Sequence, residues 1–418
     1  MQIQKVVSKK GIEAWLVEDH SRPILSVQFA FTGGTVQDPD DKPGVATFVS
    51  GMLDEGAGDL DSEAFQNRLE DLAAKMAISA SYDNVTGAFQ TLTQNRDESF
   101  KLLHMALTSP HFSDSDVDRI REQLIASLRV EEKDPDKVAT LEWYKLAFGS
   151  HPYARPTSGT IESVTAITSA DLHDYVKRIF ARDNLKVAAV GDIDATKFGE
   201  LLDTVFGDLP AKSSQKPIPD FTWQTTSKQH IITMPNPQSV VQFGFPGLKR
   251  KDPDFIPAYI LNYVIGGGGF SSKLMQEVRE KRGLAYSVYT YLYPLDHAGL
   301  YLGGVATENK SVGESLDLIK AELNRAATDG LTEQELRTAK DYLIGSFALR
   351  FDTSSKIAAQ LLALQLDDLG IDYIEKRNSE IEAVTVDDIK RVAKRLMAPK
   401  NLIVTVVGEP EGVKEAGL

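Results

Sequence analysis

The spacing of apolar residues predicts strands and helices in the chain. Residues 27–31 read Val-Gln-Phe-Ala-Phe, and residues 241–245 read Val-Gln-Phe-Gly-Phe. This alternation is typical of a strand with one buried face. Phe65, Leu69, Leu72 and Met76 instead follow helical spacing, which predicts a helix through this region. Together these patterns predict layers of helices packed on sheets.

An internal repeat relates the two halves of the chain. Three pairs of segments match in the same order: 27–31 with 241–245, 38–40 with 252–254, and 184–192 with 401–409. The first two pairs are 214 residues apart and the third pair is 217 apart. Such a nearly constant offset predicts two domains of one topology. Ser113 and Thr332 occupy matching places, and each predicts the start of a long helix because hydroxyl side chains cap helix N-termini.

A polar segment between prolines separates the two halves. Residues 212–216 read Lys-Ser-Ser-Gln-Lys, a composition typical of an exposed linker. We therefore expect a first domain over residues 1–210, a linker over 211–222 and a second domain over 223–418. Two domains of roughly 200 residues also suit a chain of 418 residues.

The charge and composition narrow the possible partners. The formal net charge is −14, whereas a surface for nucleic acid or acidic lipid needs clustered Lys and Arg. No run reaches the roughly 18 apolar residues of a membrane span, and residues 1–10 lack the apolar stretch of a secretory leader. The chain has no cysteine, which excludes disulfides, thiolate metal sites and a cysteine nucleophile. We expect a soluble protein that binds neither nucleic acid nor membrane.

The histidines do not form a recognisable zinc motif. Seven are scattered along the chain, at positions 20, 104, 111, 151, 173, 230 and 297. No two have the spacing of a helical zinc pair, and neither His-Glu-x-x-His nor His-x-x-Glu-His occurs. A structural role for each is the simpler interpretation. A metal site of unusual composition around His104, His111 or His151 stays as a third hypothesis, after the two described below.

The run Gly-Gly-Gly-Gly at 266–269 is the most conspicuous local feature. By itself it predicts a flexible turn into a helix that is capped by Ser271 or Ser272. The apolar residues of that helix, Phe270, Leu274 and Val278, share one face, and Gly283 suits its end.

A strand is predicted over residues 285–291, so Arg279 near the helix end and Tyr286 at the strand start are expected to meet. Considered locally, Arg279 belongs to a charged run that would ordinarily be a solvated face. Tyrosines in a strand are ordinarily part of sheet packing.

Taken together, these segments resemble the insulinase/pitrilysin metallopeptidases and the related mitochondrial processing peptidase. Residues 266–287 look very like the signature of that family's second domain, and residues 151–160 resemble a second family segment. The resemblance extends along essentially the whole chain. It implies an α+β fold of two homologous domains, each a mostly antiparallel sheet with helices packed on one face. It also implies pairing with a second such chain to enclose a chamber.

The sequence departs from the family where zinc-binding members carry His-x-x-Glu-His. Thr47 and Gly51 replace the two histidines, and Ser50 replaces the general base. The distal glutamate ligand of the family falls at Ser127. A catalytic zinc needs three protein ligands and an open position, and these residues provide none. We expect no metal in this chain, and zinc in a partner.

Arg279 and Tyr286, by contrast, keep the family's spacing of seven residues. The resemblance implies that this pair contacts the scissile carbonyl in a partner's active site. The first hypothesis is therefore a non-zinc-binding subunit of a heterodimeric zinc peptidase that cleaves peptides and is inactive alone. The alternative is a non-enzymatic scaffold or peptide-binding protein of the same fold. Related bacterial chains are often exported, so the compartment is expected to be the periplasm if a leader was removed, and otherwise the cytoplasm.

Overall fold

The structure, a computed structural model, describes residues 2–224 and 227–417. These residues form two compact units, and each unit is assembled from three segments of the chain. Unit 1 comprises Met1–Arg129, Pro156–Pro217 and Ala348–Tyr373. Unit 2 comprises Val130–Arg155, Ile218–Phe347 and Ile374–Leu418.

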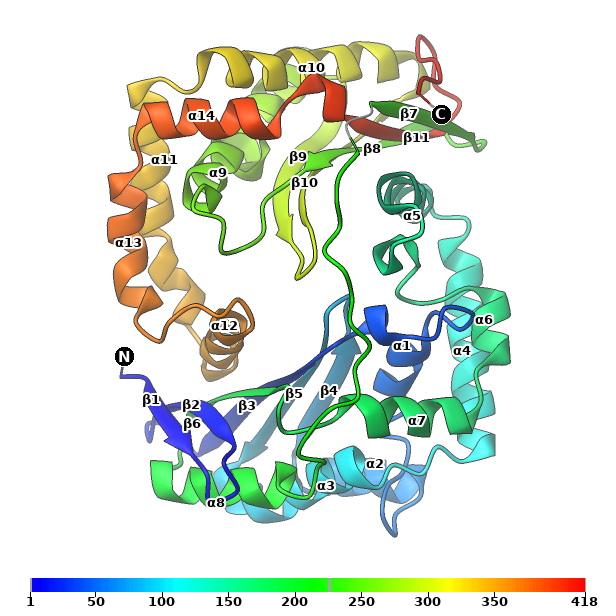
Figure 1. Ribbon diagram of the computed structural model, residues 1–418, viewed down its shortest axis with the longest axis vertical. Coiled ribbons are helices and arrows are strands. Elements are labelled where there is room, and N and C mark those ends of the chain that lie inside the picture. Colours follow the sequence, from blue (N-terminus) through cyan, green and yellow to red (C-terminus); the bar gives the residue numbers. More distant parts are fainter. Residues whose placement is uncertain (1, 225–226, 418) are drawn as a thin grey trace. The chain divides into compact units, whose positions relative to one another are not determined.

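Unit 1 is built on a six-stranded sheet (Figure 1). Its strands are β1 (Gln4–Val7), β2 (Glu13–Glu18), β3 (Ile24–Thr32), β4 (Lys75–Ala80), β5 (Asn84–Leu92) and β6 (Leu185–Gly191). The order is β1-β2-β6-β3-β5-β4, and every pair is antiparallel except β2 with β6. Its helices are α1 (Val45–Ser50), α2 (Ser62–Asp71), α3 (Arg96–Thr108), most of α4 (Asp114–Glu131), α6 (Ile161–Ala166), α7 (Ser169–Ile179), α8 (Ala195–Phe206) and α12 (Ser354–Leu366).

Unit 2 is built on a five-stranded sheet in the order β7-β11-β8-β10-β9. Its strands are β7 (Lys228–Thr233), β8 (Gln238–Pro246), β9 (Ala285–Pro294), β10 (Gly299–Glu308) and β11 (Ile403–Gly408). Only β11 and β7 pair in parallel. Its helices are α5 (Pro135–Phe148), α9 (Phe255–Asn262), α10 (Val312–Asp329), α11 (Glu333–Gly345), α13 (Tyr373–Ala383) and α14 (Val386–Leu396).

The two sheets share one topology, as the sequence repeat predicts. Strands β2, β6, β3, β5 and β4 of unit 1 correspond in order and direction to β7, β11, β8, β10 and β9 of unit 2. The repeated segment at 27–31 lies in β3 and its copy at 241–245 lies in β8. Thr332 caps α11 as predicted, with a reciprocal bond to residue Glu335. The α+β fold class with two similar, mostly antiparallel sheets is confirmed.

Each unit takes one helix from the other half of the chain. Helix α5 packs against β8 and β11 of unit 2, and α12 packs against β3 and β6 of unit 1 (Figure 1). In unit 2 the indole N–H of the fully buried Trp143 donates to the carbonyl of Ile403 at 3.0 Å. In unit 1 the side-chain amide of Gln365 donates to the carbonyl of Val187 at 2.9 Å. One face of each sheet is therefore partly covered by a helix from the other half of the chain. A division of the chain into two continuous domains would assign that helix to the other domain.

One local prediction differs from the structure. Helix α2 ends at Asp71, and Met76 lies in β4. Ala73 has a positive φ of 50°, so the chain turns before Met76 is reached and the apparent helical spacing continues by coincidence. In the polar run at 212–216, Lys212, Ser214 and Lys216 are exposed, and the backbone N–H of Lys216 donates to the side-chain oxygen of Gln37 in unit 1 at 2.8 Å.

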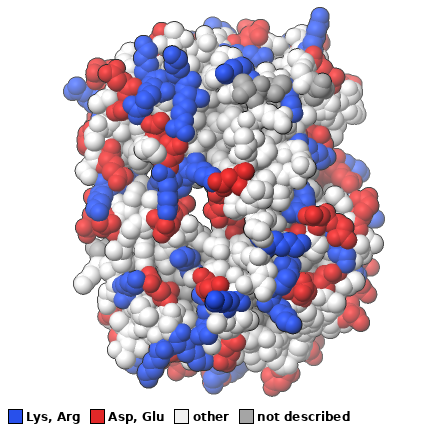
Figure 2. All heavy atoms as spheres, in the orientation of Figure 1, with Lys and Arg blue, Asp and Glu red and all other residues white. Residues whose placement is uncertain are grey.

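Basic side chains gather over α14 on the face drawn in Figure 2. Arg391 and Arg395 in this helix are paired with Asp254 and Asp252, at 2.7 Å in each case. These carboxylates are the second copy of the repeated Asp-Pro-Asp segment, so that motif anchors a helix to the loop before α9. In the described part of the chain, no helix is long and apolar enough to cross a membrane.

Helix α5 is expected to be a main source of stability for unit 2. Replacing Trp143→Ala should lower the free energy of unfolding by about 3–5 kcal/mol, because it empties a large buried volume and leaves the Ile403 carbonyl without its donor. Urea denaturation followed by far-UV circular dichroism measures the change. Lys137→Ala, at an exposed position of the same helix, is the control and should shift the midpoint little. Equal stability of both variants would contradict this packing role.

Candidate functional site

The residues at the family's zinc-binding positions are engaged in ordinary backbone contacts. In α1 the hydroxyl of Thr47 donates to the carbonyl of Thr157 at 2.7 Å, and that of Ser50 donates to Ala46 at 2.8 Å. Gly51 has no side chain and forms the C-cap of α1. Thr47 therefore ties α1 to the segment at Thr157, the Ser50 bond stays within the helix, and the three residues offer no ligand set for a divalent ion.

Helix α4 carries Ser127, the residue at the place of the family's distal ligand. The position that a Cβ on Gly51 would occupy lies 3.9 Å from a methyl carbon of Ile120 in this helix. Ser127 follows Ile120 by two helical turns, so it lies on the same side of α4, and it is exposed. Among residues 2–224 and 227–417, no three His, Asp or Glu side chains are grouped so that they could hold a metal. The residues at these positions do not fit a zinc ion.

The histidines named in the third hypothesis are bound to backbone carbonyls. A ring nitrogen of His104 lies 3.0 Å from the carbonyl oxygen of Val205, and one of His111 lies 2.7 Å from that of Gly58. His151 is buried, and its Nε2 lies 3.0 Å from the carbonyl oxygen of Pro219. Burial lowers the pKa of His151. Each ring has a structural partner, and the structure does not bring them together as a ligand group.

The glycine run lies against the edge strand of unit 2. Helix α9 continues without a break into a π-helical turn, η4 (Tyr263–Gly267), so the first glycines are helical and do not form a flexible turn. A Cβ on Gly266 would lie 2.4 Å from the hydroxyl oxygen of Thr290 and 2.6 Å from its backbone nitrogen. Only glycine allows this backbone to approach β9 so closely.

A buried chain of polar groups fixes that contact. The hydroxyl of Tyr301 donates to Thr290 at 3.0 Å, and the hydroxyl of Thr290 donates to the side-chain oxygen of Asn262 at 2.8 Å. Because Asn262 ends α9 and Thr290 lies in β9, these bonds hold the helix to the strand immediately before the glycine run.

After a 3-10 turn, η5 (Gly269–Ser271), comes a second π-helical segment, η6 (Met275–Glu280), which carries Arg279. Leu274 and Val278 are fully buried, as predicted, but Phe270 is 64% exposed and is not part of that apolar face. Ser272 stands at the start of the helix, since the backbone N–H of Gln276 donates to its carbonyl at 3.1 Å, but its buried hydroxyl has no hydrogen-bond partner. The hydroxyl of Ser271 donates to the carbonyl of Gly268 at 2.8 Å, so neither serine forms the predicted side-chain cap. Gly283, with a φ of 64°, ends the segment as predicted.

Arg279 and Tyr286 meet, as the sequence predicts. The guanidinium carbon of Arg279 lies 4.9 Å from the ring centre of Tyr286 and 4.6 Å from that of Phe270. Glu277 binds both Lys281 and Arg282, whereas no described carboxylate lies within ion-pair distance of Arg279. Arg279 is therefore a cation held between two aromatic rings without a neutralising anion.

A β-bulge sets the direction of Tyr286. The pairing of β9 with β10 slips between Val305 and Thr307, so Tyr286 and Ser287 together lie opposite a single residue. An extra residue of this kind turns a side chain to the other face of the strand. Tyr286 is consequently 82% exposed, and its ring is free to contact a ligand. The alternation of the sequence does not reveal the bulge, nor the contact with Phe270.

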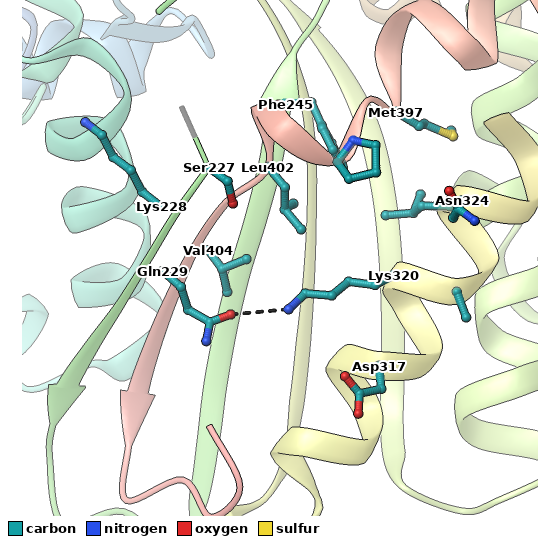
Figure 3. Close-up of a pocket in the computed structure, with 13 residues that line it drawn as sticks. Ser227, Lys228, Gln229, Phe245, Asp317, Lys320, Asn324, Met397, Leu402 and Val404 are labelled. Atoms are coloured by element: carbon teal, nitrogen blue, oxygen red, sulfur yellow. Dashed lines mark hydrogen bonds between the residues drawn. The ribbon is translucent and has the colours of Figure 1, made fainter. Parts of the chain in front are cut away.

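Unit 2 also has a pocket whose lining does not include Arg279 or Tyr286. A pocket of about 470 Å³ between α10 and the sheet is lined by apolar residues, which include Phe245, Leu402 and Val404, and by polar ones, which include Asp317 and Asn324 (Figure 3). Lys320 extends over it and donates to the side-chain oxygen of Gln229 at 3.4 Å. None of the site residues predicted from the sequence lines this pocket.

Two family models match the chain. The model described as Insulinase (Peptidase family M16) matches residues 14–161, and the model described as Peptidase M16 inactive domain matches residues 166–343. A crystal structure of a peptidase M16 inactive domain from Pseudomonas fluorescens superimposes with a TM-score of 0.92 at 28% identity, and the match covers 100% of both chains. The fold and the two matched halves define an M16-type chain. The protein belongs to peptidase family M16, the insulinase family.

Relatives of the chain have names of different kinds. The "Non-peptidase homolog YmxG" of Helicobacter pylori is 29% identical over 81% of this chain and 78% of its own length. The "Uncharacterized zinc protease SCO5738" of Streptomyces coelicolor is 30% identical over 70% of this chain and 64% of its own length. The "Probable mitochondrial-processing peptidase subunit beta" of Schizosaccharomyces pombe is 23% identical over 88% of this chain and 83% of its own length. The family resemblance seen in the sequence is confirmed.

The close approach of the glycine run predicts a marked difference between two Gly→Ala variants. Gly266→Ala should destabilise the protein by about 1–3 kcal/mol, because its Cβ would overlap Thr290 and displace the bond to Asn262. Gly345→Ala, in α11 with no atom within 4 Å, should leave stability unchanged or slightly raised. Thermal unfolding measures both. If Gly266→Ala is as stable as Gly345→Ala, the packing of η4 on β9 is not as described.

The geometry of α1 and α4 also predicts that a zinc site can be restored. The isolated chain should carry no stoichiometric zinc. The variant Thr47→His, Gly51→His, Ser127→Glu should bind about one ion, because two histidines one helical turn apart and a distal carboxylate form a three-ligand site. Metal analysis after dialysis measures the ratio. The variant without Ser127→Glu is the control and should bind more weakly; equal binding would show that Ser127 is not the third position.

Proposed function

We propose that this chain is the complementing subunit of a heterodimeric zinc peptidase and supplies Arg279 and Tyr286 to a partner's active site. The proposal depends on one observation: unit 2 holds together an exposed phenol and a guanidinium that no described carboxylate neutralises, in a chain whose zinc-ligand positions are unsuitable for an ion. A protein that needed Arg279 only for stability would be expected to neutralise it, as Glu277 does for Arg282.

The pair suits the stabilisation of a developing negative charge. When water attacks a peptide carbonyl, the oxygen becomes an oxyanion, and fixed donors aimed at that position lower the barrier. Arg279, which is half-buried, offers guanidinium N–H groups, and the exposed Tyr286 beside it offers a hydroxyl. In comparable sites one such donor contributes about 10²- to 10³-fold in rate.

The partner would provide what this chain lacks. Its zinc would polarise the carbonyl and activate water, and its own residues would hold the ion. The relative named as a processing-peptidase subunit supports a division of labour between M16 chains. Peptides or unfolded segments are the proposed substrates.

The second candidate is a scaffold or peptide-binding protein without a catalytic contribution. The name of the Helicobacter pylori relative, a non-peptidase homolog, favours this possibility for that protein. The two candidates differ in the role of Arg279 and Tyr286. A scaffold does not need their guanidinium and phenol, whereas a complementing subunit does.

Substitution of the pair in the assembled enzyme tests the proposal. The chain would be co-expressed with an M16 chain from the same organism that carries His-x-x-Glu-His, and turnover of a quenched fluorescent peptide would be measured. Arg279→Ala should lower kcat by about 100-fold or more, and Tyr286→Phe by about 10-fold or more. Native mass spectrometry should show that the complex remains intact. The isolated chain should cleave nothing.

Matched variants control for loss of charge and of hydroxyl elsewhere on unit 2. Arg337→Ala and Tyr342→Phe, both on α11, should leave turnover within about twofold of the unmodified complex. Unchanged turnover with Arg279→Ala in an intact complex would reject the catalytic role of this residue. Failure to associate with any zinc-bearing M16 chain would favour the scaffold.

A further inference from the structure

Three tyrosines form a row along the edge strand β9, beyond Tyr286 in the sequence. Tyr289, Tyr291 and Tyr293, here called the tyrosine ladder, occupy alternate positions of β9 and therefore share one face. Neighbouring ring centres are 6.1 Å and 6.4 Å apart. Tyr289 is 43% exposed and Tyr291 is 38% exposed. The bulge brings Tyr286 onto the same face, so the ladder is continuous with the Arg279–Tyr286 pair.

Unit 1 shows that the fold does not require aromatic residues at these places. Hydrogen-bond register connects equivalent positions in the two sheets, starting from the repeated segments in β3 and β8. One row of paired residues across three neighbouring strands is Gln28, Ala88 and Ala77 in unit 1, and the equivalent row in unit 2 is Gln242, Gly304 and Tyr289. The row two residues further along is Ala30, Thr86 and Ser79 in unit 1, and Gly244, Leu302 and Tyr291 in unit 2. Small residues, Ala77 and Ser79, therefore suffice in the same topology, and both are exposed.

The strand beneath the ladder is shaped to carry it. A Cβ on Gly304 would lie 2.8 Å from the hydroxyl oxygen of Tyr289 and 3.0 Å from its ring, so the ring lies directly against the backbone of β10. Leu302, opposite Tyr291, is buried. Burial, with the nearby Asp136, raises the pKa of Tyr289, and burial raises that of Tyr291 to about 12. The hydroxyls therefore stay protonated at physiological pH and remain neutral hydrogen-bond donors.

The spacing of the rings matches an extended peptide. Alternate side chains of a strand repeat every 6.6 Å or so, about the distance between neighbouring rings of the ladder. Aromatic rings contact other apolar side chains favourably and present little flexible surface. A single row of three rings is as wide as one peptide chain, whereas a stable protein interface covers roughly 800 Å² on each partner.

We infer that the tyrosine ladder binds extended peptide substrates that carry aromatic or large aliphatic side chains at alternate positions, and aligns them with Arg279 and Tyr286. The inference rests on the proposed function for the fate of the bound peptide. Binding itself needs only this chain. The ladder acts in specificity and affinity, and the Arg279–Tyr286 pair acts on the reacting carbonyl.

Peptide binding to the isolated full chain tests the inference directly. The probe is a fluorescein-labelled twelve-residue peptide with Phe at alternate positions and Ser and Gly between them, and binding is measured by fluorescence anisotropy. A second peptide has the same composition with its Phe residues adjacent. The alternating peptide should bind about tenfold or more tightly than the second one, because only its side chains meet successive rings. Equal affinity of the two peptides would overturn the inference.

Variants of the ladder identify the binding surface. Tyr289→Ser with Tyr291→Ser should weaken binding of the alternating peptide by about tenfold or more, whereas changing both to Phe keeps the rings and should alter affinity by less than about threefold. Tyr342→Ser, at an exposed tyrosine of α11, is the matched control and should bind normally. Circular dichroism establishes folding, and the Phe variant keeps the test decisive if the Ser variant unfolds. Normal binding by a folded Ser variant would overturn the inference, and so would loss of binding in the Phe variant.

Turnover by the assembled enzyme separates the two proposals. Ladder variants should raise KM at nearly constant kcat, because they remove binding shared by substrate and transition state, whereas Arg279→Ala should lower kcat. If Arg279→Ala has no effect but alternating peptides still need the ladder, the complementing role fails and the ladder stands. If the Ser variant of the ladder abolishes association with the second chain but binds peptide normally, this face is a protein interface and the inference falls.

Discussion

The contact of Gly266 with the edge of β9 is the constraint on which the candidate site depends. Because no side chain stands between η4 and Thr290, the chain can leave α9, turn through the glycine run and return as η6 beside the start of β9. The buried bonds from Tyr301 to Thr290 and from Thr290 to Asn262 hold that arrangement. The guanidinium of Arg279 is placed over Tyr286 as a consequence.

The two units show how one topology can be used in two ways. In unit 1 the hydroxyls of Thr47 and Ser50 have become part of the backbone hydrogen bonding around α1, so this helix keeps its place but offers no metal ligand. In unit 2 the equivalent sheet carries a bulged tyrosine and a row of aromatic rings, and η6 places the half-buried guanidinium of Arg279 beside them. A subunit with this division can contribute to a reaction without containing the reaction's metal. The proposed function is a contribution of this kind.

Several features could be read from residues alone because they rest on local rules. Alternation in 27–31 and 241–245 identified strands, and a serine or threonine before an acidic helix start marked α4 and α11. The spacing between Arg279 and Tyr286 was sufficient to predict that they meet. The helix expected through Met76 failed because a turn at Ala73 interrupts a pattern that looks continuous in sequence. Phe270 has the sequence spacing of the apolar face but is exposed, because it lies in the 3-10 turn η5, before the helix that carries Leu274 and Val278 begins.

The sequence by itself determined the repeat, the layers of helices on sheets and the proximity of Arg279 and Tyr286, whereas its resemblance to a family implied the mostly antiparallel α+β class and the absence of zinc ligands. These follow from residue identity and short-range spacing, which a linear chain records directly. Only the tertiary structure decided that α5 and α12 pack in the unit of the other half. It also decided that a bulge turns Tyr286 to the face shared by Tyr289 and Tyr291. Those outcomes depend on strand register and on contacts between segments far apart in sequence, and no local pattern of side chains encodes them.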